Sequence, residues 1–141
     1  MEYQRFGDDI VVRMDRGEEI LSGLKKVCLK EKVKLASVSA IGAVDEFQVG
    51  LYDVETKKYE SRTYQGPYEI LSLLGNITTK DGEYYAHLHM ACSGEDGKNV
   101  GGHLNKARIS ATLEMFIHVI DGNVERKTDD VTGLNVFDFG K

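Results

Sequence analysis

Three of the four histidines lie close together in the second half of the sequence, and they are the strongest candidates for chemistry. One leucine separates His87 from His89, and thirteen residues separate His89 from His103. On a β-strand, side chains at positions i and i+2 emerge from one face about 6.5–7 Å apart, so two imidazoles can bind one ion. Zn²⁺ favours neutral imidazole ligands, and a site with three protein ligands leaves a position for water or a substrate. The pattern therefore indicates an open site for Zn²⁺ or another divalent transition metal.

The same spacing also has a purely structural interpretation. Paired histidines occur on polar sheet faces, where they form hydrogen bonds with a neighbour such as Tyr85 or with one another across strands. The spacing of His87 and His89 alone leaves both interpretations open. Cys92 is not a competing ligand, because it lies one residue out of phase with these histidines and faces the other side of a regular strand.

The segment from Glu83 to Cys92 must position two of the histidines, and its alternation is typical of a strand. One face carries Tyr84, Ala86, Leu88 and Met90, and the other carries Tyr85, His87, His89 and Ala91. Both histidines therefore point the same way. Residues 93–102 contain several glycines and are expected to form a loop that brings His103 to this pair.

One amphipathic helix is expected over residues 16–31. Asp15 and Glu18 have the spacing of a capping box, with the aspartate as the cap. Apolar residues then recur with helical period at Ile20, Leu21, Leu24, Val27 and Cys28. This pattern predicts a helix with one face buried against the rest of the protein.

The remaining segments favour short strands. Such strands are expected at residues 1–6, 9–14, 35–41, 44–52, 58–64, 68–78 and 108–120, with an extended tail at 124–139. Gly42 and the Gly66-Pro67 pair are interpreted as breaks between strands. The connections are mostly too short for crossover helices, so we expect a largely antiparallel sheet with one main helix, an α+β fold.

The composition predicts one soluble domain over residues 1–141. Hydrophobic residues make up 41% of the chain and charged residues 29%, the balance of a globular protein. The sequence lacks a secretory signal and a long apolar run, so we expect a cytoplasmic protein without a membrane segment. The net charge of −5 disfavours non-specific DNA binding, because that affinity comes mostly from lysine and arginine.

Several motifs, taken in their order, resemble the PPC domain, the plant and prokaryote conserved domain. They are the run from Gly66 to Ile77, then Ala86-His87-Leu88-His89, then Val100-Gly101-Gly102-His103-Leu104. The similarity extends over essentially the whole chain, including the segment from Ser39 to Ala43. In prokaryotes such domains stand alone.

The resemblance implies a single-domain protein that assembles as a homotrimer, with the helix packed beside an antiparallel sheet. It also implies a metal on His87, His89 and His103. Plant relatives combine this domain with Arg-Gly-Arg-Pro segments that enter the minor groove of DNA. This chain has no such segment, so DNA binding is suggested only by the resemblance to the family and not by residues of this sequence.

Two hypotheses follow from different classes. In the first, the protein is a trimeric binding or regulatory protein that contacts DNA weakly and holds a structural or sensory metal, with no catalytic residues. In the second, it is a small metal-dependent enzyme of hydrolase or lyase type that takes a small molecule at the ion. Glu95, Asp96 or Glu114 would then accept a proton.

Overall fold

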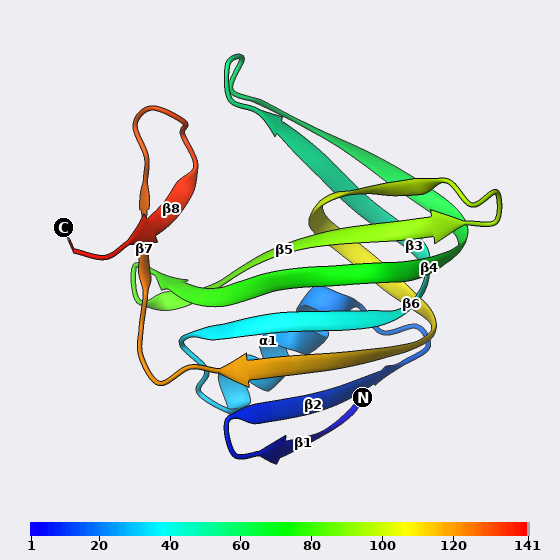
Figure 1. Cartoon of the computed structure of the whole chain (residues 1–141), viewed down its shortest axis with the longest axis horizontal. Coiled ribbons are helices and arrows are strands. Elements are labelled where there is room, and N and C mark those ends of the chain that lie inside the picture. The colour runs from blue at the N-terminus through cyan, green and yellow to red at the C-terminus, as the bar shows by residue number, and fades with distance from the viewer. Residues whose placement is uncertain (141) are drawn as a thin grey trace.

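The computed structural model describes residues 1–140, which form one helix and eight strands (Figure 1). The elements are β1 (Glu2–Phe6), β2 (Asp9–Asp15), α1 (Ile20–Lys30), β3 (Ala36–Asp53), β4 (Lys58–Lys80), β5 (Glu83–Gly94), β6 (Asn99–Val119), β7 (Glu125–Thr128) and β8 (Asn135–Asp138). The predicted α+β class is confirmed. No helix in these residues has the length and apolar character needed to cross a membrane.

The strands form one sheet in the order β1-β2-β6-β3-β4-β7-β8, and β5 pairs with both β4 and β6. Every pairing is antiparallel except the short contact between β4 and β7. Because β3 also pairs with both β4 and β6, these four long strands close into a ring of pairings. This ring holds β5 and β6 side by side, and these two strands carry the three histidines.

Strands β3 and β4 were each expected as two shorter strands, divided at Gly42 and at Gly66-Pro67, and that prediction was wrong. β3 runs without interruption from Ala36 to Asp53, with irregular register between Ala40 and Gly42 and between Val44 and Glu46. Gly42 does not end the strand, because its missing side chain lets β6 approach; an added Cβ would lie 2.9 Å from the Cα of Leu113. The bulges bend β3 without ending its pairing.

Helix α1 begins one turn later than predicted. Its N-cap is Glu19, whose carboxylate accepts hydrogen bonds from the backbone N–H groups of Leu21 and Ser22. Only half of the expected capping box forms: the Glu18 carboxylate accepts the Asp15 N–H at 2.7 Å, but the Glu18 N–H bonds to the Asp15 backbone carbonyl. These contacts close a turn that lies ahead of the helix.

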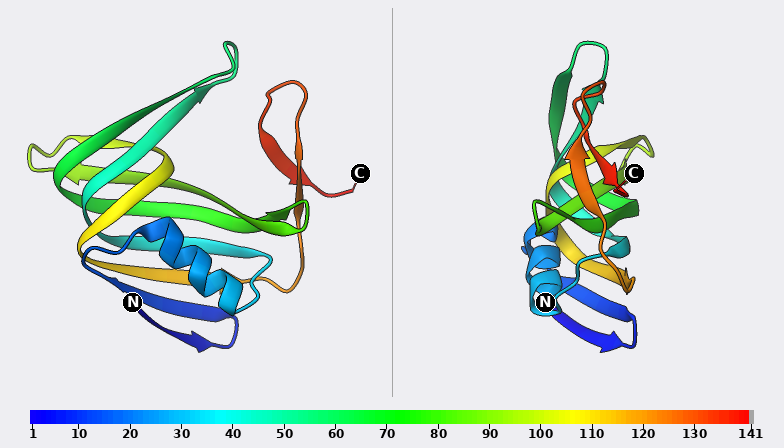
Figure 2. Two further views of the ribbon diagram at one scale, coloured as in Figure 1. Left: turned by 180° about the vertical axis from the view of Figure 1, so that it is seen from behind. Right: turned by 90° about the vertical axis from the view of Figure 1, so that its left-hand side faces the viewer.

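Helix α1 covers one face of the sheet, as the view from behind shows (Figure 2). Its buried side chains are Ile20, Leu24, Val27 and Cys28. Cys28 and Cys92 are free, buried thiols, and burial raises the pKa of each to about 12. These cysteines therefore act as core residues and not as ligands or nucleophiles.

The opposite face of the sheet is open over β3, β4 and β6. It exposes four large apolar side chains, each by more than half: Ile41, Leu71, Leu74 and Phe116. They line one shallow hollow together with Ser39, Ala40, Ser72 and Glu114. Leu74 is paired directly with His89, so the apolar area adjoins the histidines. We call Ile41, Leu71, Leu74 and Phe116 the apolar face.

Candidate metal centre

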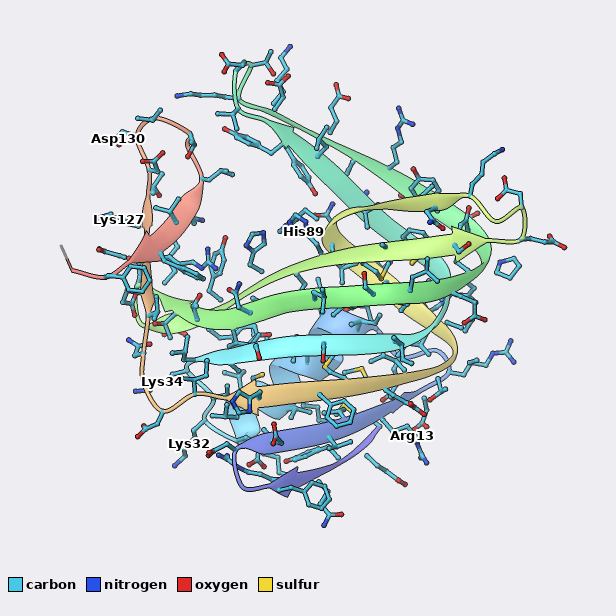
Figure 3. The ribbon with its side chains drawn as sticks, in the orientation of Figure 1. Arg13, Lys32, Lys34, His89, Lys127 and Asp130 are labelled. Carbon is cyan, nitrogen blue, oxygen red and sulfur yellow. The ribbon has the colours of Figure 1, made fainter. Side chains whose placement is uncertain are left out.

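Strand pairing brings the three histidines together. His89 of β5 lies directly opposite His103 of β6, and His87 precedes His89 by two residues on the same strand. The ring centroids are 5.1 Å apart for His87 and His89, 5.2 Å for His87 and His103, and 5.7 Å for His89 and His103. Figure 3 labels His89, which in this view lies between the β3–β4 hairpin and the β7–β8 hairpin.

The route by which His103 reaches the pair differs from the prediction. The sequence favoured a loop over residues 93–102, but β5 continues to Gly94 and β6 begins at Asn99. A tight hairpin turn of four residues, 95–98, joins them. His103 therefore stands on a strand and takes its position from the hydrogen-bonded register, which is a firmer support than a loop.

The donor atoms have a geometry that fits a metal ion. One nitrogen from each histidine can be chosen so that all three lie within 4.8 Å of one another. The Nε2 atoms of His87 and His89 are 3.2 Å apart. With Zn–N bonds of about 2.0–2.1 Å, two ligands of a tetrahedral ion are separated by about 3.4 Å. The pair thus has the required spacing, and a nitrogen of His103 lies within 4.8 Å of both.

The environment keeps two of the rings in the state that binds a metal. Burial, followed by the charges of His103, His89 and Arg126, lowers the pKa of His87 to about 4. Burial also lowers the pKa of His103, and His89 adds to this effect. Both rings are therefore neutral at neutral pH, and a neutral imidazole nitrogen is the form that binds Zn²⁺.

Tyr59 supports the centre and was missed by the sequence analysis. It comes from the β3–β4 hairpin, and its ring meets that of His103 edge to face, with centroids 6.1 Å apart. Its hydroxyl donates a hydrogen bond to Asn105 Oδ1 at 2.8 Å. Gly50, the strand partner of His103, has no side chain and leaves room for the tyrosine ring. Nothing in the local sequence around Tyr59 signals this role, because the contact depends on the bend of β3 and β4.

The acidic residues considered as proton acceptors lie away from the histidines. Glu95 and Asp96 stand in the hairpin turn, and four strand residues, or about 13 Å, separate His89 from Ser93 at its base. Glu114 lies opposite Arg13 and Ile41, at the other end of β6 from His103. Within residues 1–140, no carboxylate joins the three-histidine group.

His118 is a surface residue. Its Nδ1 lies 2.9 Å from Asp9 Oδ1 of the neighbouring strand β2, and both side chains are more than half exposed. It takes no part in the histidine cluster.

The family model of the Plants and Prokaryotes Conserved (PCC) domain, the domain that the sequence motifs resemble, matches residues 1–121. The chain belongs to this family. Solved structures agree with the assignment. A PPC protein from Pyrococcus horikoshii has a TM-score of 0.85 and 30% identity, over 99% of this chain and 95% of that chain.

Two further structures resemble this PPC chain. A metal-containing protein from Archaeoglobus fulgidus has a TM-score of 0.87 and 34% identity, over 96% of both chains. A candidate DNA-binding protein from Bacteroides thetaiotaomicron has a TM-score of 0.96 and 27% identity, over 99% of this chain and 98% of that chain. Among curated proteins, no sequence matches this chain.

Proposed function

We propose that this PPC protein is a metal-binding protein that holds Zn²⁺, or another divalent transition metal, on His87, His89 and His103. The observation that carries the proposal is the convergence of three imidazole nitrogens within 4.8 Å on one sheet face. The metal content of the Archaeoglobus relative, 34% identical, supports it. A bound ion would supply Lewis acidity at the position that three ligands leave open.

The chain itself contributes a preformed set of ligands. The register of β5 and β6 sets the positions of His89 and His103, and the neutral rings of His87 and His103 need lose no proton before binding at neutral pH. Affinity is then not reduced by ordering a loop or by competition with protons at these two rings. The cytoplasmic location expected from the sequence belongs to this proposal, and the buried thiols of Cys28 and Cys92 suit a reducing compartment.

Elemental analysis of untagged protein tests the metal site. We expect about one metal ion per chain in the unaltered protein and less than about one tenth of that in a His87→Ala/His89→Ala/His103→Ala variant, since the ion would lose every protein ligand. The control is His118→Ala, which removes an exposed histidine outside the cluster and should keep full metal content.

Two results would contradict the proposal. One is metal-free protein even after incubation with excess Zn²⁺ and gel filtration. The other is equal metal content in the triple variant and in His118→Ala, which would assign the metal to other residues. In either case the histidines would be a hydrogen-bonded group on a polar sheet face, the structural interpretation left open by the sequence.

We also propose that the protein assembles as a homotrimer through the apolar face. Four large apolar side chains, each more than half exposed, gather on the sheet face that α1 does not cover. Monomeric soluble proteins rarely leave such a patch in water, which supports its burial against further copies of the chain. The assembly would also cover Leu74, the neighbour of His89.

Phe116→Glu is expected to convert the assembly to monomers. The side chain is 54% exposed in the single chain, so the change leaves the core intact but would bury a charge in the interface. Light scattering should give three times 15.7 kDa for the unaltered protein and 15.7 kDa for the variant. Val131→Glu, a charge added at a residue 78% exposed in the β7–β8 turn, should remain trimeric. A monomeric unaltered protein would refute the trimer.

A regulatory role with DNA contact is the second candidate function. The likeness to the Bacteroides protein favours it. Because the chain has a net charge of −5, we expect any binding to DNA to be weak and to fall steeply with added salt. A band-shift assay that shows no complex even at low salt would exclude direct DNA binding.

A further inference from the structure

Arg126 is a buried cation that pairs with no carboxylate in residues 1–140. Its side chain, on β7, is 7% exposed. Its three nitrogens donate to neutral acceptors: Nε to Thr78 Oγ1 at 2.8 Å, Nη1 to the Asn135 carbonyl at 2.6 Å, and Nη2 to Asn76 Oδ1 at 2.8 Å. A charge removed from water without a counter-charge costs free energy, so this arrangement needs a reason.

The guanidinium of Arg126 lies over two aromatic rings. Its central carbon lies 4.6 Å from the ring centroid of Tyr85 and 4.6 Å from that of Phe137. Cation–π attraction offsets part of the desolvation cost and fixes the plane of the group. A guanidinium has five N–H donors, and three are used, so two have no acceptor among the described residues. These two N–H groups are available to a further acceptor.

Arg126 stands next to the histidines on the open face of the sheet. Asn76, which accepts one of its hydrogen bonds, is the strand partner of His87. Tyr85, on which it stacks, precedes His87 by two residues, so one strand repeat of about 6.5–7 Å separates their positions.

We propose that Arg126 and the metal together bind a small dicarboxylate. One carboxylate takes the open position on the ion, and the other accepts the two free N–H groups of Arg126. The forked donors of a guanidinium match the two oxygens of a carboxylate. The proposal rests on the metal site proposed above. The metal–oxygen bond and the N–H···O hydrogen bonds span part of the one strand repeat between the two groups, so a short dicarboxylate such as malonate or a slightly longer acid can reach both.

The family assignment does not supply this site. The family model matches residues 1–121, whereas Arg126, Asn135 and Phe137 lie beyond that range. The β7–β8 hairpin therefore adds to the histidine cluster a charged group that the matched part of the chain lacks. Lys127, the next residue on β7, is exposed and paired with Asp138, so it offers a matched control.

Titration of Co²⁺-loaded protein with malonate tests the proposal, with visible absorption as the readout. The metal content is measured first. We expect malonate to bind about tenfold more tightly than acetate, because acetate reaches only the ion. In Arg126→Lys, malonate affinity should fall about tenfold while acetate affinity stays unchanged, because the fork is lost but the ion is not. Lys127→Gln should bind both anions like the unaltered protein.

Three other results would contradict the proposal, and each would indicate a different role for Arg126 or the histidines. Equal affinities for malonate and acetate in the unaltered protein would leave Arg126 as a clamp for the β7–β8 hairpin. Phosphate binding more tightly than malonate would indicate a single-oxyanion site. Protein that holds no Co²⁺ would remove the metal site, and with it this inference, before any anion is added. Should Arg126→Lys fail to fold, the Arg126 Nε–H resonance of the unaltered protein gives the answer, since it should shift with malonate and not with acetate.

Discussion

Replacing Gly75 by alanine is expected to lower the free energy of unfolding by about 3 kcal/mol and to remove most of the bound metal. Gly75 of β4 pairs with Leu88 of β5, the residue between His87 and His89. An added Cβ would lie 2.7 Å from Leu88 Cδ2 and 2.8 Å from Leu88 Cα, and it would overlap the carbonyl oxygen of His87. A side-chain rotation cannot relieve contacts with backbone atoms, so β4 and β5 must separate and His87 must move.

Urea denaturation and elemental analysis of the same preparation measure both effects. The control is Gly82→Ala, since a Cβ at Gly82 meets nothing within 4 Å. Its φ of +78° still makes alanine unfavourable, so the control should cost about 1 kcal/mol and keep the metal. If both variants lost the same amount of stability and metal, the close approach of β4 to β5 would not be the reason that position 75 requires glycine.

Metal-free protein is expected to lose about 1 kcal/mol of stability between pH 6.5 and pH 4.5, because solvent screening of the half-buried ring roughly halves the full effect of about 2 kcal/mol. An unfolded histidine has a pKa of about 6.5, whereas burial holds that of His87 at about 4 in the folded protein. Over this window the unfolded chain binds a proton that the folded chain does not, so stability falls as the pH falls. The lowered pKa of His103 acts in the same direction.

Urea denaturation with a chelator present, at half-unit steps from pH 7 to pH 4.5, measures this loss. His87→Gln should have a clearly flatter profile, because one of the two responsible rings no longer titrates. His118→Ala should retain the full loss, because His118 is exposed beside Asp9. An identical profile in His87→Gln and the unaltered protein would show that His87 is as easily protonated in the folded state as in the unfolded one.

The sequence correctly predicted the features that depend on the periodicity of a single strand or helix. The alternation around Leu88 placed His87 and His89 on one face, and the apolar period of residues 20–28 located the helix. The strands expected at residues 1–6 and 9–14 were also confirmed, and they pair as the β1–β2 hairpin. These features depend on neighbours within a few residues, which is the range over which strand and helix periods act.

The prediction was wrong at glycines that allow two strands to pack closely. Gly101 and Gly102 were interpreted as loop residues, yet both lie within β6. A Cβ at Gly101 would lie 3.1 Å from the Cα of Ala91 on β5, so the glycine lets the two strands lie close. A glycine that relieves crowding and one that forms a turn look alike in sequence.

The contacts of Tyr59 and Arg126 with the site could not be predicted from the sequence. Arg126 reaches Asn76, 50 positions earlier in the chain, and Tyr59 reaches Asn105, 46 positions later. Both contacts exist because β3, β4, β5 and β6 close into a ring and because β7 folds back onto β4. Neither segment carries a motif, so only the assembled sheet reveals them.

The pairing of His89 with His103 determines where residues can be inserted or deleted during evolution without separating the histidines. Four residues lead from His89 to Ser93, and four lead back from Asn99 to His103, so the two arms of the hairpin match in length. A residue gained or lost in one arm would turn the outgoing or returning histidine to the opposite face, whereas the tip at 95–98 can change length freely. Relatives that can hold the ion should therefore be recognised by equal arms, not by a fixed count of residues between the two histidines.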